Sequence, residues 1–249
     1  MTSLSPLGLS LLFGTVAAAA NVVGGLVIVS RRDWNEIALK YLIALGAGFM
    51  LAATFLRMMP ESFALSPQAP LLILGGYFLV HFFEHTIAPH FHFGEEVHQE
   101  LMVNPAVGFS ALVGLAIHTF FDGVSIASGF LVSVPFGLLV SCAIFLHKLP
   151  EGVTVASIAL ASGRGTRGAL TASLILAGST LAGVLGMSRF STAITYALPI
   201  STGVTLYVAA SDLIPEVNEE RGVAMALVVF LGVALFWGAE VALSALGVS

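Results

Sequence analysis

The chain has 249 residues, of which 57% are hydrophobic and only 9% are charged, and its formal net charge is −5. Soluble domains carry about 25% charged residues, so this composition excludes an ordinary soluble protein and indicates a polytopic membrane protein. The lipid bilayer is therefore the expected surrounding, and no nucleic-acid partner is expected.

Apolar blocks long enough to cross a membrane follow one another along the whole chain. A hydrocarbon core about 30 Å thick needs roughly 20 apolar residues in a helix. The sequence predicts eight such spans, at about residues 6–29, 37–59, 70–90, 106–129, 134–161, 168–187, 193–215 and 222–246. We therefore predict an all-α fold that forms one transmembrane domain over residues 1–249.

The loops between these blocks predict the topology. The first block lacks the basic residues that open a signal peptide, so we expect a retained first span. With the N-terminus outside, the inner loops would hold six basic residues and the outer ends only two, which are Arg57 and Arg189. The positive-inside rule therefore predicts that both termini lie outside.

The third predicted span and the loop after it contain five histidines. His81 and His85, near the end of the span, are expected to form hydrogen bonds between helices. The segment APHFHFGEEVHQE, from Ala88 to Glu100, adds His90, His92 and His98 among acidic residues. These three could attract metal ions at the inner surface, and a plain solvated loop is the alternative.

Ionisable residues interrupt the fourth and fifth predicted spans in the same pattern. HTFFDG places His118 and Asp122 four residues apart, and HKLPEG places His147 and Glu151 at the same spacing. On a helix this spacing stacks two side chains on one face. Burying such groups in hydrocarbon is unfavourable unless they pair, neutralise or bind an ion. Two imidazoles and two carboxylates on adjacent helices form a ligand set for a divalent transition metal.

Pro150 interrupts the hydrogen bonding of the fifth predicted span. It has no amide hydrogen to donate, and its ring clashes with the carbonyl of Leu146, which is left to face a cation or water. Proline is common in membrane helices, so Pro150 alone is a weak indicator. Gly123 and Gly152, which follow the two acids, are expected to allow close helix contacts.

The two motifs share one pattern in consecutive helices that run in opposite directions, which predicts an inverted repeat. A second pair agrees with it: MMPES ends the second span and LIPEV ends the seventh. Interrupted helices at corresponding positions indicate a transporter with its site near the midplane. Asp212, Glu216 and Glu61 are candidate pathway residues, with a position at the membrane interface as the alternative. Glu240 in the eighth span is expected to pair with a neighbouring polar group.

HTFFDG followed by HKLPEG, with GFMLAATFLRMMPES in the second span and LYVAASDLIPEV in the seventh, resembles the ZIP (Zrt/Irt-like) family of divalent metal transporters over essentially the whole chain. The resemblance implies eight helices, with the first three and last three related by pseudo-twofold symmetry around the fourth and fifth. It also implies outside termini, homodimers and the passage of zinc, or in some members iron, manganese or cadmium, into the cytoplasm. We expect alternating access by movement of one helix bundle against the other, in a bacterial cytoplasmic membrane.

The resemblance also assigns site residues. His118 and Asp122 match the fourth-helix metal ligands of the family, and His147 and Glu151 match those of the fifth. Many members have Asn after the first histidine and a carboxylate after the second, which help to form an adjacent second metal site.

Here those positions hold Thr119 and Lys148, so the sequence predicts one metal ion per transport site. Lys148 lies three residues before Glu151, within reach of it on the same helix face, and could act as counter-ion in the empty site. An orientation toward water or a carbonyl is the alternative.

Two other classes of function use the same ligands. An intramembrane zinc-dependent hydrolase would keep a water at an open ligand position, but the HExxH pattern is absent and each acid already matches a ligand position. A metal sensor without transport would need an output domain, for which the apolar blocks leave little room. We therefore predict a transporter rather than an enzyme, with a divalent metal as substrate and no cofactor.

Overall fold

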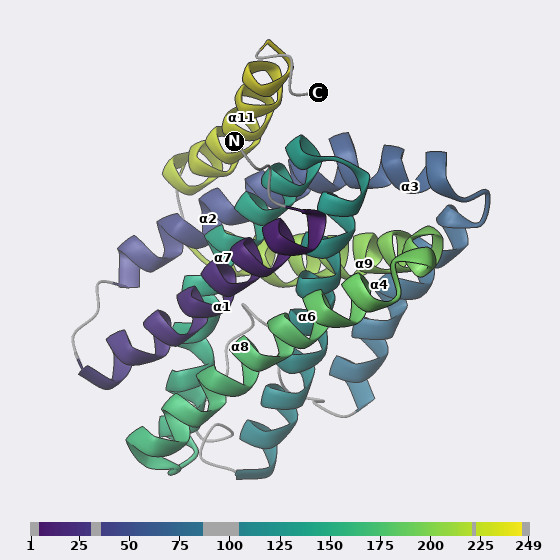
Figure 1. The fold of residues 1–249 in the computed structure, drawn as a ribbon. Coiled ribbons are helices and arrows are strands. Elements are labelled where there is room, and N and C mark those ends of the chain that lie inside the picture. Colours follow the sequence, from purple (N-terminus) through teal and green to yellow (C-terminus); the bar gives the residue numbers. More distant parts are fainter. Residues whose placement is uncertain (1–4, 31–35, 87–104, 221–222, 246–249) are drawn as a thin grey trace.

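The computed structural model describes residues 5–30, 36–86, 105–220 and 223–245, and these are helical over nearly their whole length (Figure 1). The helices are α1 (Pro6–Ser30), α2 (Glu36–Ala53), α3 (Met59–Leu65), α4 (Ala69–Thr86), α6 (Pro105–Val132), α7 (Val134–Ala161), α8 (Gly165–Arg189), α9 (Ile194–Tyr207), α10 (Ile214–Asn218) and α11 (Val223–Ala245). Within the described ranges, seven helical segments are long and apolar enough to cross a membrane. The helix α4 stands where the third span was predicted, and the polar residues of its last turns lower its hydropathy. The all-α membrane fold is therefore confirmed, and a count of eight spans is consistent with it.

The second and seventh spans each contain a π-helical segment just before a proline. These segments are η1 (Thr54–Met58) and η3 (Val208–Leu213), and they precede Pro60 and Pro215. A proline ring would clash with the carbonyl four residues back in a regular α-helix, and the wider π turn accommodates it. The second span therefore continues to Leu65, beyond the end that the sequence predicted at about residue 59. A short 3₁₀ turn, η2 (Ser191–Ala193), leads into α9.

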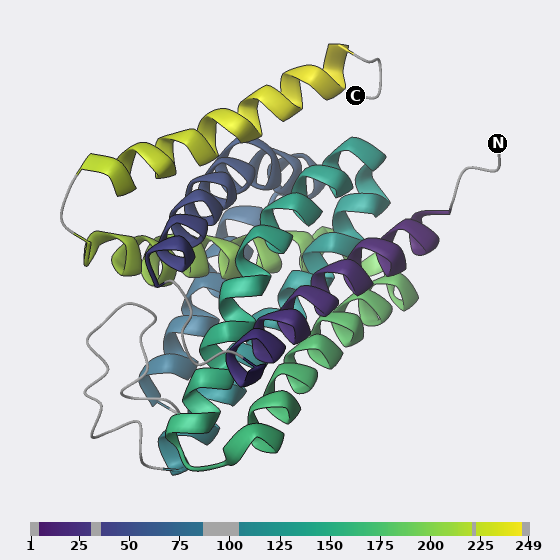
Figure 2. The same cartoon turned by 90° about the vertical axis from the view of Figure 1, so that its left-hand side faces the viewer.

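The helices form two groups, which we call the bundle and the row. The bundle consists of α1, α6, α7 and α8, which all pack against one another, and the row runs in the order α11, α2, α9, α4. Figure 2 shows α11 at the edge of the molecule, beside α2 and away from α8. The helices pack in corresponding pairs. The pair of α1 and α7 corresponds to the pair of α8 and α6, and the pair of α2 and α11 corresponds to the pair of α9 and α4. These pairings are the ones that the inverted repeat predicts.

Glycines bring the helices of the bundle into backbone contact. Gly152 of α7 and Gly24 of α1 each lie against the backbone of the other helix, and Gly123 of α6 and Gly183 of α8 repeat this arrangement. A Cβ atom at any of the four would approach a carbonyl oxygen closer than real atoms do. The two glycines that follow the acids of the repeated motif are therefore helix contact points, as predicted.

Candidate metal centre

Two helices of the bundle, α6 and α7, bring the four predicted ligands together near their middle. His118 and Asp122 stand one turn apart on α6, and His147 and Glu151 do so on α7, which remains helical through Pro150. All four residues are buried, with at most 4% of their surface exposed. One donor atom from each lies within 4.8 Å of every other.

The distances between these donor atoms suit a tetrahedral metal ion. His147 Nε2 lies 3.3 Å from Asp122 Oδ2, and His118 Nε2 lies 3.4 Å from Glu151 Oε1 and 3.7 Å from Asp122 Oδ2. Bonds of about 2.0–2.2 Å from zinc to nitrogen and oxygen place tetrahedral ligand atoms about 3.4 Å apart. The four side chains could thus hold such an ion with small adjustments.

Both histidines turn their Nε2 atoms toward this space. His147 Nδ1 lies 3.2 Å from the carbonyl oxygen of Ala143, which can only accept, so Nδ1 carries the proton and Nε2 keeps its lone pair. His118 Nε2 is buried and has no hydrogen-bond partner among the described residues. Leaving a buried polar atom unpaired is unfavourable, and a bound metal ion would satisfy it.

Lys148 lies in the same buried place, with 0% of its surface exposed. Its Nζ is 2.6 Å from Asp122 Oδ2 and 2.5 Å from Glu151 Oε2, and it donates a hydrogen bond of 3.1 Å to Thr119 Oγ1. The Thr119 hydroxyl donates in turn to Glu151 Oε1. The ammonium therefore faces the acids of both helices rather than water or a backbone carbonyl. With neutral histidines, the two acids and the lysine together carry a formal charge of −1.

A small cavity opens on this site from the row. It is lined by His118, His147, Pro150, Glu151, Val208, Asp212 and Leu213. Asp212 comes from η3 and is 2% exposed, and its Oδ1 has no hydrogen-bond partner in the described part of the chain. The residues of α7 that line the cavity, from His147 to Glu151, lie at the middle of the helix and just past it. Asp212 thus faces the predicted ligands from the other group of helices.

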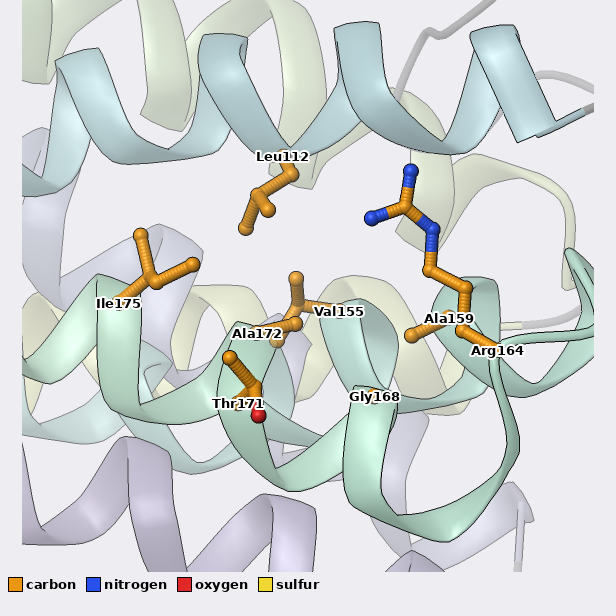
Figure 3. A pocket seen from close by; sticks show the side chains of 8 residues that line it. All are labelled: Leu112, Val155, Ala159, Arg164, Gly168, Thr171, Ala172 and Ile175. Atoms are coloured by element: carbon orange, nitrogen blue, oxygen red, sulfur yellow. The ribbon is translucent and has the colours of Figure 1, made fainter.

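A second cavity, of about 150 Å³, lies between α6, α7 and α8 (Figure 3). Its lining is apolar except for Thr171 and for Arg164, whose guanidinium stands at one end of the space. It contains none of the predicted metal ligands. The donor groups, and not the amount of space, therefore identify the candidate metal centre.

The other candidate residues lie away from this centre. Glu61 in α3 and Glu216 in α10 are partly buried, and neither lines the cavity. The rings of His81 and His85 pack 3.9 Å apart, and His85 Nδ1 donates to the carbonyl of His81. His90, His92 and His98 fall outside the described residues.

Arg57 does not lie at the outer end of its span, where the sequence predicts it. Arg57 lies within η1, inside the span Ile37–Leu65, because this span continues through its proline. Its Nη1 is 3.4 Å from Glu240 Oε1, so Glu240 has the polar partner that was expected for it. The sequence does contain an indication that Arg57 lies inside its span. Arg57 and Asp212 both stand three residues before the proline of the repeated motif.

Known proteins resemble this chain over the region that contains the site. The family model described as ZIP Zinc transporter matches residues 94–239. Zinc transporter ZIP4 of Homo sapiens is 34% identical over 114 residues, which are 44% of this chain and 17% of that protein. The Zinc transporter ZIP13 homolog of Drosophila melanogaster is 32% identical over 139 residues, which are 51% and 39% of the two chains. Zinc transporter ZIP13 of Pongo abelii is 26% identical over 212 residues, which are 77% and 62%. The chain thus spans less than two thirds of the length of each of these relatives.

Proposed function

Since this chain belongs to the ZIP family of zinc transporters, we propose that it carries a divalent transition-metal ion across a membrane through the four-residue centre. The observation that carries the proposal is the convergence of four buried donor side chains from two membrane helices within 4.8 Å. Zinc is the proposed substrate because it suits two nitrogens and two carboxylate oxygens and because the matched relatives are named as zinc transporters. The same ligand set would also suit iron(II), manganese or cadmium.

The proposed mechanism moves the bundle against the row. The ligands all belong to α6 and α7 of the bundle, whereas Asp212 belongs to η3, which continues α9 of the row. Sliding between the two groups would bring the ligands past Asp212 and open the centre to each side of the membrane in turn. We place the Asp212 side in the cytoplasm of a bacterial cell, with both termini outside and with the chain as a homodimer. Lys148 acts as a resident counter-ion, so that each centre takes one metal ion.

The hydrolase and sensor alternatives are not favoured, because the matched family and relatives are transporters by name. We expect saturable metal uptake by proteoliposomes that contain the native protein. The metal uptake by the double variant His147→Ala with Glu151→Ala should fall to the level of empty vesicles, because this variant lacks half of the ligands. Uptake is measured separately for zinc, iron(II), manganese and cadmium. The ion that the native protein takes up fastest is identified as the preferred substrate.

A matched control is the double variant His81→Ala with Glu216→Ala, which removes one histidine and one acid away from the centre. It should keep most of the native flux. Tight zinc binding without flux in correctly reconstituted native protein would contradict transport and support a hydrolase or a sensor.

Asp212 is proposed to receive the ion as it leaves the centre. The variant Asp212→Asn keeps the shape of the side chain and removes its charge, so it should lower the zinc flux about tenfold, as expected when an attraction of about 1.4 kcal/mol is lost. The amount of zinc bound per protein should stay unchanged, since the four ligands remain. Glu216→Gln is the control that should transport normally. If Asp212→Asn transports at the native rate, the residue is not on the pathway.

A further inference from the structure

The second cavity, shown in Figure 3, is one end of a groove between α6 and α8. Its lining includes Leu112 of α6 and Ile175 of α8. An open hollow of about 440 Å³ follows it, and the lining of this hollow includes Ala116 of α6 and Ser179 of α8. These two residues stand four positions, or about one helical turn, further along their helices. The cavity and the hollow therefore follow one another on the same face of the helix pair.

The groove has the length of one leaflet of a bilayer. From Gly168 to Ser179, α8 rises by eleven residues, which is about 16 Å, and half of a hydrocarbon core of about 30 Å is about 15 Å. Thr171 and Ile175 are exposed, so the groove opens to the side of the helices, where lipid surrounds a membrane protein. The hydroxyls of Thr171 and Ser179 donate to backbone carbonyls. Apart from Arg164 at its end, the groove thus suits an acyl chain.

Three glycines determine the position of Arg164 at the end of the groove. Gly163 and Gly165 flank it with φ angles of 75° and 64°, in the left-handed region that favours glycine. This turn lets the backbone nitrogen of Arg164 donate to the carbonyl of Ala159 at 3.0 Å. A Cβ at Gly168 would lie 2.5 Å from the Cβ of Arg164, so only glycine leaves room for the arginine stem. Figure 3 shows the guanidinium at the end of the cavity.

This end of the groove is positively charged. Arg164 and Arg167 are both exposed, and the sequence from Gly152 to Ser211 contains no acidic residue. On the proposed topology this end lies at the cytoplasmic surface, and basic pockets between membrane helices on that side bind anionic lipid headgroups. A guanidinium binds phosphate oxygens through two parallel hydrogen bonds. An anion with an apolar tail therefore matches both the charge and the groove.

We propose that the groove between α6 and α8 holds one anionic phospholipid, whose phosphate binds Arg164 and one of whose acyl chains lies along the groove. The residues that line it all belong to the bundle or to the turn between α7 and α8. The bound lipid therefore moves with the bundle and leaves the boundary with the row free. The inference goes beyond the proposed transport function, and its test needs no metal transport.

Native mass spectrometry of the protein in detergent measures its affinity for phosphatidylglycerol and for phosphatidylcholine with the same acyl chains. The native protein should bind one phosphatidylglycerol about fivefold more tightly than phosphatidylcholine, as expected for one basic residue at the headgroup. Arg164→Gln should bind the two lipids equally. Arg167→Gln is the matched control, because it removes the same charge three residues away without changing the lining of the cavity. It should keep the native preference.

A second pair of variants tests the acyl chain. Ile175→Trp places an indole ring in the groove and should lower the affinity for phosphatidylglycerol about tenfold, because about ten carbon contacts of the chain are lost. Leu174→Trp is the control that should bind the lipid normally. Leu174 is the adjacent residue of α8 and is also exposed, but it does not line the cavity.

The unfolding temperature in detergent shows whether each variant is folded. Phosphatidylglycerol should raise it in the native protein and in Arg167→Gln, but not in Arg164→Gln, because a ligand stabilises only the fold that binds it. An equal loss of preference in the two arginine variants would indicate general attraction to the surface and overturn the proposal. If Ile175→Trp dissociates a dimer and leaves the lipid affinity unchanged, a second copy of the chain covers the groove and the proposal is wrong. If Arg164→Gln does not fold, Arg164→Met takes its place.

Discussion

Replacement of Lys148 by methionine should destabilise the metal-free protein more than any other single change of charge discussed above. The ammonium contacts Asp122 Oδ2 at 2.6 Å and Glu151 Oε2 at 2.5 Å, and all three side chains are buried. Removing one partner of a buried ion pair costs about 3–5 kcal/mol, because the remaining charge is left uncompensated. Here two carboxylates would be left facing each other. The unfolding temperature of the metal-free variant in detergent should therefore fall by roughly 10 °C.

Zinc should restore much of this loss, because a divalent ion supplies the missing positive charge and binds only the folded protein. Lys40→Met is the matched control: the pair of Lys40 with Glu220 is just as short, at 2.6 Å, but its side chains are 23% and 41% exposed. Such an exposed pair contributes at most about 1 kcal/mol. A Lys148→Met protein as stable as Lys40→Met without metal would contradict the counter-ion role.

Lys148→Asp should raise the bound zinc from one ion per chain to two, and an unchanged number would contradict the account of the missing second site.

Substitution of Gly123 by alanine should disrupt the contact between α6 and α8 and with it the metal centre. The added Cβ would collide with the carbonyl oxygen of Thr180 and lie 2.8 Å from the backbone nitrogen of Val184. Neither atom can move without shifting its helix, so we expect a loss of more than about 3 kcal/mol, above the usual range for an overpacked side chain. Asp122 is the adjacent residue, and zinc affinity should fall as well.

Gly114→Ala, in the same helix, provides the comparison. A Cβ at Gly114 would meet nothing within 4 Å, and alanine is the better helix former. This variant should be at least as stable as the native protein and should bind zinc normally. Thermal unfolding in detergent and zinc titration measure both properties. Equal behaviour of the two variants would show that the crossing of α6 and α8 does not require glycine.

The fold could be predicted largely because each span is a nearly continuous apolar block, and hydropathy marks such blocks directly. Hydropathy does not mark the π-helical segments. The predicted end of the second span and the predicted position of Arg57 were therefore wrong. The four ligands could be predicted from their shared spacing of four residues. The direction of the Lys148 side chain could not, because it depends on how closely α6 approaches α7. Gly129 of α6 and Gly137 of α7 lie against each other, and further glycines hold α6 against α8 and α7 against α1. A single sequence does not locate such contacts in space.

The single positive charge of Lys148 also has an electrical consequence for the proposed cycle. The empty centre carries a formal charge of −1, and with one divalent ion it carries +1. Moving one elementary charge through a membrane potential of 100 mV changes the energy by about 2.3 kcal/mol. An inside-negative voltage would therefore pull the loaded centre inward and push the empty centre back outward with equal strength. Without the lysine, the loaded centre would be neutral and the whole response to voltage would fall on the return step.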